Sequence, residues 1–179
     1  MNSLFNDYKK QIFPIGLVLI LALSRLIPHP YNFTPVIAVA IMSGYFFKNI
    51  YFSYLIVIIS MLISDLFIGF YSNMIFVYIS LLLISLVFYK VSKKINFKSL
   101  FAYSFAGAVI FFIISNFGVW ALGSLGVNDV PYEKNLKGLI ECYFFAIPFF
   151  GNTFFSTLIF SYACYSANYF YKKKFVYKY

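Results

Sequence analysis

Long apolar stretches separated by short polar breaks dominate the chain, and their lengths decide what they form. A helix that crosses a membrane needs about 20 mostly apolar residues. The pattern predicts six such helices, at residues 11–27, 34–48, 50–69, 73–90, 100–123 and 151–171. A further apolar segment, 138–150, is too short to span alone. It is expected either to extend the last helix or to form a re-entrant or interfacial piece.

Composition decides the solvent that surrounds these helices. Hydrophobic residues make up 63% of the 179 residues and charged residues only 11%. Soluble domains have about 45–50% apolar and about 25% charged residues, so this chain lacks the polar residues to cover a core. We expect an all-α integral membrane protein, a bundle of six transmembrane helices forming a single domain over residues 1–179.

Charge along the chain predicts its orientation. All but three of the 14 basic residues fall before the first helix, between helices two and three, between four and five, or after six; the exceptions are Arg25, Lys134 and Lys137. Cytoplasmic loops carry the excess of Lys and Arg, so both termini are expected in the cytoplasm. The net charge of +9 then reflects topology and the lipid bilayer rather than nucleic acid.

The stretch "RLIPHPYNFTP", residues 25–35, concentrates polar and helix-breaking residues on the predicted outer side. Pro28 and Pro30 end the first helix because proline cannot continue the hydrogen-bond ladder. Thr34 followed by Pro35 is typical of the start of the next helix. The prolines therefore mark the connection, whereas its polar side chains need another explanation.

Three other polar clusters are predicted at the same depth: "ISDLFIGF", "SNFGVW" and "AIPFFGNT". Polar groups are costly in hydrocarbon, so they face a bundle interior or a wet cavity. We expect a pocket for an amphipathic small molecule in the outer half of the bundle, with Arg25 holding an anionic group, the asparagines forming hydrogen bonds and Trp120 stacking. The candidate binding residues are Arg25, His29, Asn32, Asp65, Asn116, Trp120 and Asn152.

All of these residues except Asn32 also have a structural interpretation. Arg25 and Asp65 could neutralise each other, which is compatible with ligand binding. Asn116 and Asn152 could form hydrogen bonds between helices, and Trp120 could anchor the interface. His29 could be a capping or surface residue.

The end of the chain leaves a choice about the last helix. If Asn152 caps a helix that begins at Thr153, residues 153–171 alone form a full span of about 28 Å. That spacing favours a separate re-entrant or interfacial segment at 138–150. Half-helix ends that point at a binding site recur in transporters.

Motifs for catalysis are scarce. The sequence contains no HExxH, GxSxG or glycine-rich phosphate loop, and Cys142 and Cys164 form no CxxC pair. An acid–base trio of His29, Asp65 and Glu141 would rest only on a shared side of the membrane. We expect no enzyme activity, no cofactor and no metal site.

Ala40 and Gly44 on helix two form a small-xxx-small pair. Such pairs let helices approach closely, either within the bundle or at a partner. A docking role would fit the alternative function, a non-catalytic structural or assembly protein of the cell envelope that binds membrane partners.

The motifs "RLIPHPYNFTPV", "LISDLFIGF", "SNFGVW" and "AIPFFGNTFF" resemble a family of small bacterial membrane proteins of unassigned function, over roughly residues 20–165. More loosely, the size, six helices and inward termini resemble the substrate-binding S components of energy-coupling-factor vitamin transporters. These resemblances imply a bacterial inner-membrane protein that takes up a vitamin-like molecule from the outer side with an ATP-driven energising module. S components commonly dock through AxxxA on helix one; "PIGLVLILALSR" lacks it, which leaves Ala40 and Gly44 as a substitute.

Overall fold

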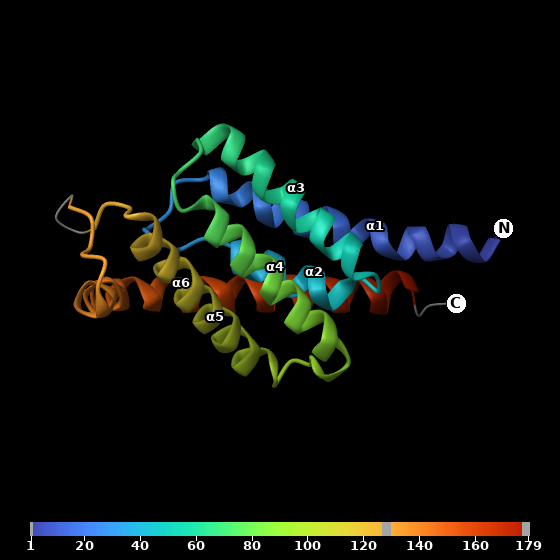
Figure 1. Cartoon of the computed structure of the whole chain (residues 1–179). Helices are drawn as coiled ribbons and strands as arrows, with labels where there is room; N and C mark the ends of the chain where they lie inside the picture. Colours follow the sequence, from blue (N-terminus) through green and yellow to red (C-terminus); the bar gives the residue numbers. More distant parts are fainter. Residues whose placement is uncertain (1, 127–129, 177–179) are drawn as a thin grey trace.

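The computed structural model describes residues 2–126 and 130–176 and contains six α-helices (Figure 1). They are α1 (Asn2–Leu23), α2 (Val36–Phe46), α3 (Ile50–Ile68), α4 (Met74–Val91), α5 (Leu100–Leu122) and α6 (Leu136–Tyr171). Short helical turns follow three of them, at Ser24–Leu26, Ser92–Lys94 and Lys172–Val176. The expected all-α class and the expected six helices are confirmed over the described residues.

Four helices are long and apolar enough to cross a membrane: α3, α4, α5 and α6. Ile12–Leu26 forms a shorter apolar segment. The expected second span, 34–48, is corrected: α2 has only 11 residues, because Pro35 precedes its first turn and the backbone is extended at Phe47. Its rise of about 16 Å is roughly half the thickness of a bilayer's hydrocarbon core.

The short helix α2 is the centre of the bundle. Its residues from Val36 to Gly44 are all buried, and it contacts each of the other five helices. Figure 1 shows α1 and α3 side by side along one flank of the bundle. On another flank α5 packs against α6. An apolar helix that is buried all round needs no polar face, which fits the uniform hydrophobicity of this segment.

Single residues set several helix ends. Asn49 Oδ1 accepts hydrogen bonds from the backbone N–H groups of Tyr51 (2.9 Å) and Phe52 (3.4 Å), which caps the start of α3. In the same way Asn135 Oδ1 accepts from Gly138 N at 2.9 Å at the start of α6. These caps use asparagines in the loops, so the start of α6 lies well before Asn152.

The last helix is continuous over 36 residues, from Leu136 to Tyr171. The expected helix start at 151 and the expected cap at Asn152 are therefore wrong, and 138–150 is the first part of α6. Pro148 lies inside the helix, where its missing N–H favours a kink. In Figure 1 the orange beginning of α6 is viewed nearly down its axis, whereas the red remainder lies across the view, so the helix changes direction between them.

The bundle has two distinct ends. Figure 1 shows the beginning of α1 and the end of α6 together at one end of the bundle, which we call the terminal end. There, Tyr89 Oη donates to the Lys48 carbonyl at 2.8 Å and Tyr162 Oη donates to the Phe97 carbonyl at 2.9 Å, which ties two loops to the helices. We call the opposite end, where α1 and α3 finish, the pocket end. Lys178, one of the predicted cytoplasmic lysines, lies outside the described residues.

Candidate functional site

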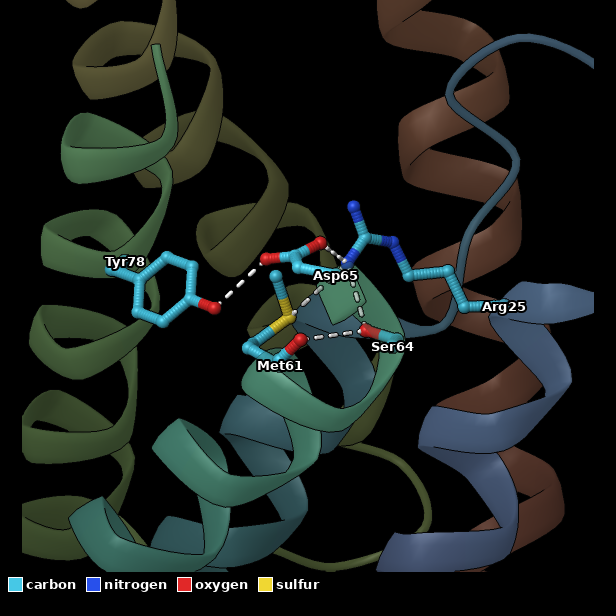
Figure 2. A network of polar contacts seen from close by, with 5 residues as sticks. All are labelled: Arg25, Met61, Ser64, Asp65 and Tyr78. Atoms are coloured by element: carbon cyan, nitrogen blue, oxygen red, sulfur yellow. Dashed lines mark hydrogen bonds and ion pairs between the residues drawn. The ribbon is translucent and has the colours of Figure 1, made fainter. Parts of the chain in front are cut away.

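Arg25 and Asp65 form an ion pair at the pocket end (Figure 2). Arg25 lies in the helical turn after α1, and Asp65 lies in the last turn of α3. Nη1 of Arg25 contacts Asp65 Oδ1 and also donates to Ser64 Oγ at 2.9 Å. The Asp65 side chain is 0% exposed and that of Arg25 is 12% exposed. The mutual neutralisation predicted as one interpretation of this pair is thus observed.

Tyrosines complete the surroundings of this ion pair. Tyr78 Oη of α4 donates to the second oxygen of Asp65, Oδ2, at 2.8 Å, so both carboxylate oxygens have partners. The Tyr71 hydroxyl, in the turn between α3 and α4, lies close enough to Arg25 and Asp65 to be influenced by both charges. Burial raises the pKa of Tyr71 above its usual value, and the nearby Asp65 carboxylate raises it further. Tyr71 therefore stays a neutral hydroxyl beside Arg25.

A pocket of about 210 Å³ opens beside Arg25. We call it the arginine lobe. Its polar lining consists of Arg25, Asn32, Thr34, Tyr71 and Thr153. Its apolar lining consists of Val36, Ile37, Met61, Val77 and Phe111. The residues come from the connection before α2 and from α2, α3, α4, α5 and α6 and their turns, so the lobe forms only when the whole bundle is assembled.

A second pocket, of about 200 Å³, adjoins the first. We call it the phenylalanine lobe, after Phe111, Phe112, Phe149 and Phe150 in its wall. Its polar lining consists of Asn32, Asn73, Ser115, Asn116 and Thr153. Asn32, Val77, Phe111 and Thr153 line both lobes. The two lobes therefore adjoin at these four residues, and we refer to them together as the two-lobed pocket.

Three of the seven predicted binding residues, Arg25, Asn32 and Asn116, line this pocket. Asn116 Nδ2 donates to the Phe112 carbonyl at 2.8 Å within α5. Asn32 adopts a left-handed backbone conformation, with φ of 59°, which asparagine tolerates better than most residues. Asp65 supports the pocket from behind by holding Arg25. The sequence thus identified the charged pair and two of the asparagines.

The structure places the other three predicted residues outside the pocket. His29 is exposed, with Nδ1 at 3.0 Å from the Pro30 carbonyl. Trp120 Nε1 donates to the Glu133 carbonyl at 2.9 Å, and the Lys134 ammonium lies 5.6 Å from the Trp120 ring centroid. Both residues thus organise loops. Asn152 Nδ2 donates to the Tyr31 carbonyl at 3.0 Å and joins α6 to the connection before α2.

The candidate docking pair, Ala40 and Gly44, lies inside the bundle. Ala40 is 0% exposed. A Cβ added at Gly44 would lie 2.8 Å from the backbone nitrogen of Tyr89 and would collide with the Ser85 carbonyl oxygen. The small residues therefore let α2 approach α4, and their faces are not available to a partner.

Sequence reasoning missed Asn73, which lies just before α4. Its Nδ2 donates to the Ser115 carbonyl of α5 at 2.9 Å. A Cβ at Gly118 would collide with Asn73 Oδ1 and with the Phe76 ring, so the glycine of "SNFGVW" makes room for Asn73. The available signal was an asparagine in the tight turn "YSNM". Asn73 attaches the start of α4 to α5 and so fixes one wall of the phenylalanine lobe.

The three residues of the acid–base hypothesis have separate partners. Asp65 is paired with Arg25, Glu141 lies 3.8 Å from Lys137, and His29 contacts the Pro30 carbonyl. Among the described residues no group of three or more His, Cys, Asp or Glu side chains could hold a metal ion. What the pocket offers chemically is hydrogen bonding, aromatic contact and one compensated charge.

Comparison with known proteins gives one match. The model of a family described as "Family of unknown function (DUF6580)" matches residues 5–178. No curated protein and no solved structure matches the chain.

Proposed function

The chain belongs to the family of unknown function DUF6580, and we propose that it binds a small amphipathic molecule in the two-lobed pocket and takes part in its uptake across a membrane. The observation that carries this proposal is the placement of Arg25, Asn32 and Asn116 around two adjoining lobes: Arg25 lines the arginine lobe, Asn116 lines the phenylalanine lobe, and Asn32 lines both. Arg25 and Asn32 come from the connection between α1 and α2, whereas Asn116 comes from α5, more than 80 residues later in the sequence. Small-molecule sites are typically concave and combine apolar walls with placed polar groups, and this pocket combines both kinds of residue in similar numbers.

The carboxamides of Asn32 and Asn116 support a role in ligand binding rather than in hydrogen bonds that hold the bundle together. Asn32 is exposed and its side chain has no hydrogen-bond partner within the described part of the chain, and Asn116 uses only its Nδ2, toward its own helix. Polar groups in a membrane protein normally have partners or line a wet cavity. Asn32 and Asn116 therefore have hydrogen-bonding capacity left for a ligand.

We place the pocket on the outer side of the membrane, with both termini in the cytoplasm. The lysines before α3, around the α4–α5 connection and after α6 belong to the terminal end, which makes it the cytoplasmic end by the positive-inside rule. The pocket at the opposite end then opens toward the outer face of a bacterial inner membrane. A ligand would enter from outside, as in the S components that the sequence resembles, with an ATP-driven partner module energising uptake.

The test is native mass spectrometry of the protein released gently from its own membrane, followed by identification of any small molecule. We expect one bound molecule per chain in the wild type and its loss in Asn116→Ala. Asn32→Gly should also lose it, because glycine keeps the left-handed backbone and removes only the carboxamide.

Asn168→Ala is the matched control. Asn168 is buried in the last turns of α6, at the terminal end, and its Oδ1 has no partner among the described residues. Removing it should leave ligand occupancy unchanged. A wild-type mass without a small molecule would refute the proposal. If a membrane protein co-purified stoichiometrically instead, the envelope-assembly alternative would replace it.

A further inference from the structure

The charge balance of the two-lobed pocket limits what it can hold. Among the described residues, Arg25 is the only formally charged side chain that lines either lobe. Its charge is balanced by Asp65, which is fully buried and held in place by the Tyr78 hydroxyl at 2.8 Å. The pocket wall is therefore electrically neutral, although it contains an arginine.

An anionic ligand would meet a penalty here. A carboxylate or phosphate at Arg25 would have to share the guanidinium with Asp65, and two like charges close together in a low-dielectric site destabilise each other. Displacing Asp65 instead would leave a buried carboxylate without its cation. The expectation from sequence that Arg25 holds an anionic group is therefore not favoured by the contacts of Arg25.

The guanidinium still has donors to offer. Nη1 makes the contacts with Asp65 and Ser64, and Figure 2 shows the second terminal nitrogen of Arg25 pointing away from both. A guanidinium only donates hydrogen bonds, so it suits an uncharged acceptor such as a carbonyl oxygen. Asn32 and Asn116 can donate and accept, and they suit the polar edge of the same ligand.

The phenylalanine lobe defines the other part of the ligand. Phe111 and Phe112 of α5 and Phe149 and Phe150 of α6 contribute to its wall. The rings of Phe112 and Phe150 meet edge to face, with centroids 5.4 Å apart. Such walls favour stacked or edge-on contact with a flat ring.

We propose that the pocket selects an uncharged ligand in which a flat aromatic or heteroaromatic ring carries a carbonyl-type acceptor, and that Asp65 sets this preference by neutralising Arg25. The ring lies in the phenylalanine lobe and the acceptor faces Arg25. This inference rests on the proposed function and adds the chemical class of the ligand and a specificity-determining residue.

Benzamide and benzoate provide a matched pair of probes, since they share size and ring and differ in charge at pH 7. With the purified protein in lipid nanodiscs, we expect benzamide to bind at least tenfold more tightly than benzoate, as measured by ligand-observed NMR titration. Asp65→Asn keeps an acceptor for Tyr78 and releases the charge of Arg25. It should reverse the order, so that benzoate binds more tightly than benzamide.

Two control variants separate charge selection from general damage. Asn116→Ala should weaken both probes alike and leave their ratio unchanged. Glu141→Gln removes a carboxylate that is paired with Lys137 outside the pocket, and it should change neither affinity. A reversal caused by Glu141→Gln as well would mean that net charge, rather than the Arg25–Asp65 pair, sets the preference.

The outcomes distinguish this inference from the proposed function. If benzoate bound the wild type as tightly as benzamide, the neutral-ligand inference would fail while small-molecule binding stood. If neither probe bound, the co-purified molecule would decide: an uncharged ring compound supports the inference, and a carboxylate or phosphate ester overturns it. If there were no such molecule either, both proposals would fail. If Asp65→Asn does not fold, the inference is tested by the ratio of benzamide to benzoate affinity in the wild type and by the charge of the co-purified ligand.

Discussion

Asn152 in the middle of α6 donates a hydrogen bond from Nδ2 to the backbone carbonyl of Tyr31, at 3.0 Å, across 121 residues of sequence. The acceptor lies in the connection between α1 and α2, one residue before Asn32. The Phe33 ring lies next to Phe160 of the same helix, with centroids 6.1 Å apart. The connection that carries one wall of the pocket is thus held to α6 by a hydrogen bond and a ring contact.

Asn152→Ala should loosen this connection without unfolding the bundle. Hydrogen bonds between membrane helices contribute on the order of 0.6–2 kcal/mol each, which is too little to decide the fold. We expect faster amide hydrogen exchange over residues 27–35, measured by mass spectrometry in nanodiscs, and faster ligand release. Asn168→Ala, at the other end of α6, should leave exchange there unchanged. Equal exchange rates in Asn152→Ala and wild type would show that other contacts hold the connection.

The Arg25–Asp65 pair should behave as a coupled unit in unfolding experiments. Arg25→Ala leaves the fully buried Asp65 with Tyr78 as its remaining side-chain partner. Breaking a buried pair from one side costs on the order of 3–5 kcal/mol, because an uncompensated charge remains. We expect a loss of that size in the free energy of unfolding, measured by SDS titration in mixed micelles.

The double variant Arg25→Met, Asp65→Leu tests the reason for that loss. It removes both charges and should recover most of the stability lost in Arg25→Ala, since no unpaired charge is left. The single variants Arg25→Met and Asp65→Leu are measured alongside it. If the double variant lost as much free energy of unfolding as these two single variants added together, lost packing rather than an unpaired charge would explain the effect. Whatever its stability, the double variant should bind the ligand less well, because it lacks the hydrogen-bond donors of Arg25.

The apolar pattern was sufficient to predict six helices, and four of them are long and apolar enough to cross a membrane. It overestimated the length of α2, which has only 11 residues. It placed the breaks near Pro28, Gly69 and Lys93 correctly, since proline, glycine and charged residues end apolar runs. It placed the start of α6 too late in the sequence, because Pro148 and Asn152 are residue types that are common at helix ends. Neighbouring helices and side chains can satisfy the backbone groups that a proline frees in a membrane helix, so composition alone does not reveal that α6 continues.

Only part of the candidate site could be predicted from the sequence. A charged residue near an apolar run needs a partner, so Arg25 and Asp65 were identifiable. Tyr71 and Tyr78 were not, because two tyrosines among 17 carry no positional signal. Asn73 and Gly118 were also missed as a pair, since their contact depends on how closely α4 approaches α5. The helices follow from the sequence pattern, whereas the pocket follows from tertiary packing.

Gly118→Ala tests that close approach. A Cβ at this position would collide with Asn73 Oδ1 and with both Cβ and Cγ of Phe76, so the start of α4 must move. Overpacking of this kind costs typically about 1–3 kcal/mol. We expect a loss of stability in that range and a loss of the ligand, measured by SDS titration and native mass spectrometry.

Gly151→Ala is the matched control for this substitution. It is also a glycine inside a long helix, but nothing lies within 4 Å of the added Cβ. Alanine is favoured over glycine in a helix interior by roughly 1 kcal/mol, so this variant should be at least as stable as wild type. Equal effects at Gly118 and Gly151 would contradict the proposed contact between Asn73 and α5.

The proposed orientation predicts which side of the membrane each end of the bundle faces. In a background with Cys142 and Cys164 replaced by alanine, a cysteine at exposed Lys98 should react with a membrane-impermeant maleimide only after the inner membrane is opened. A cysteine at exposed Val130 should react in intact spheroplasts. The physical reason is the excess of lysine at the terminal end, which is retained in the cytoplasm during insertion. Labelling in the opposite sense would put the pocket on the cytoplasmic side, and uptake from outside through an outward-facing pocket would no longer be tenable.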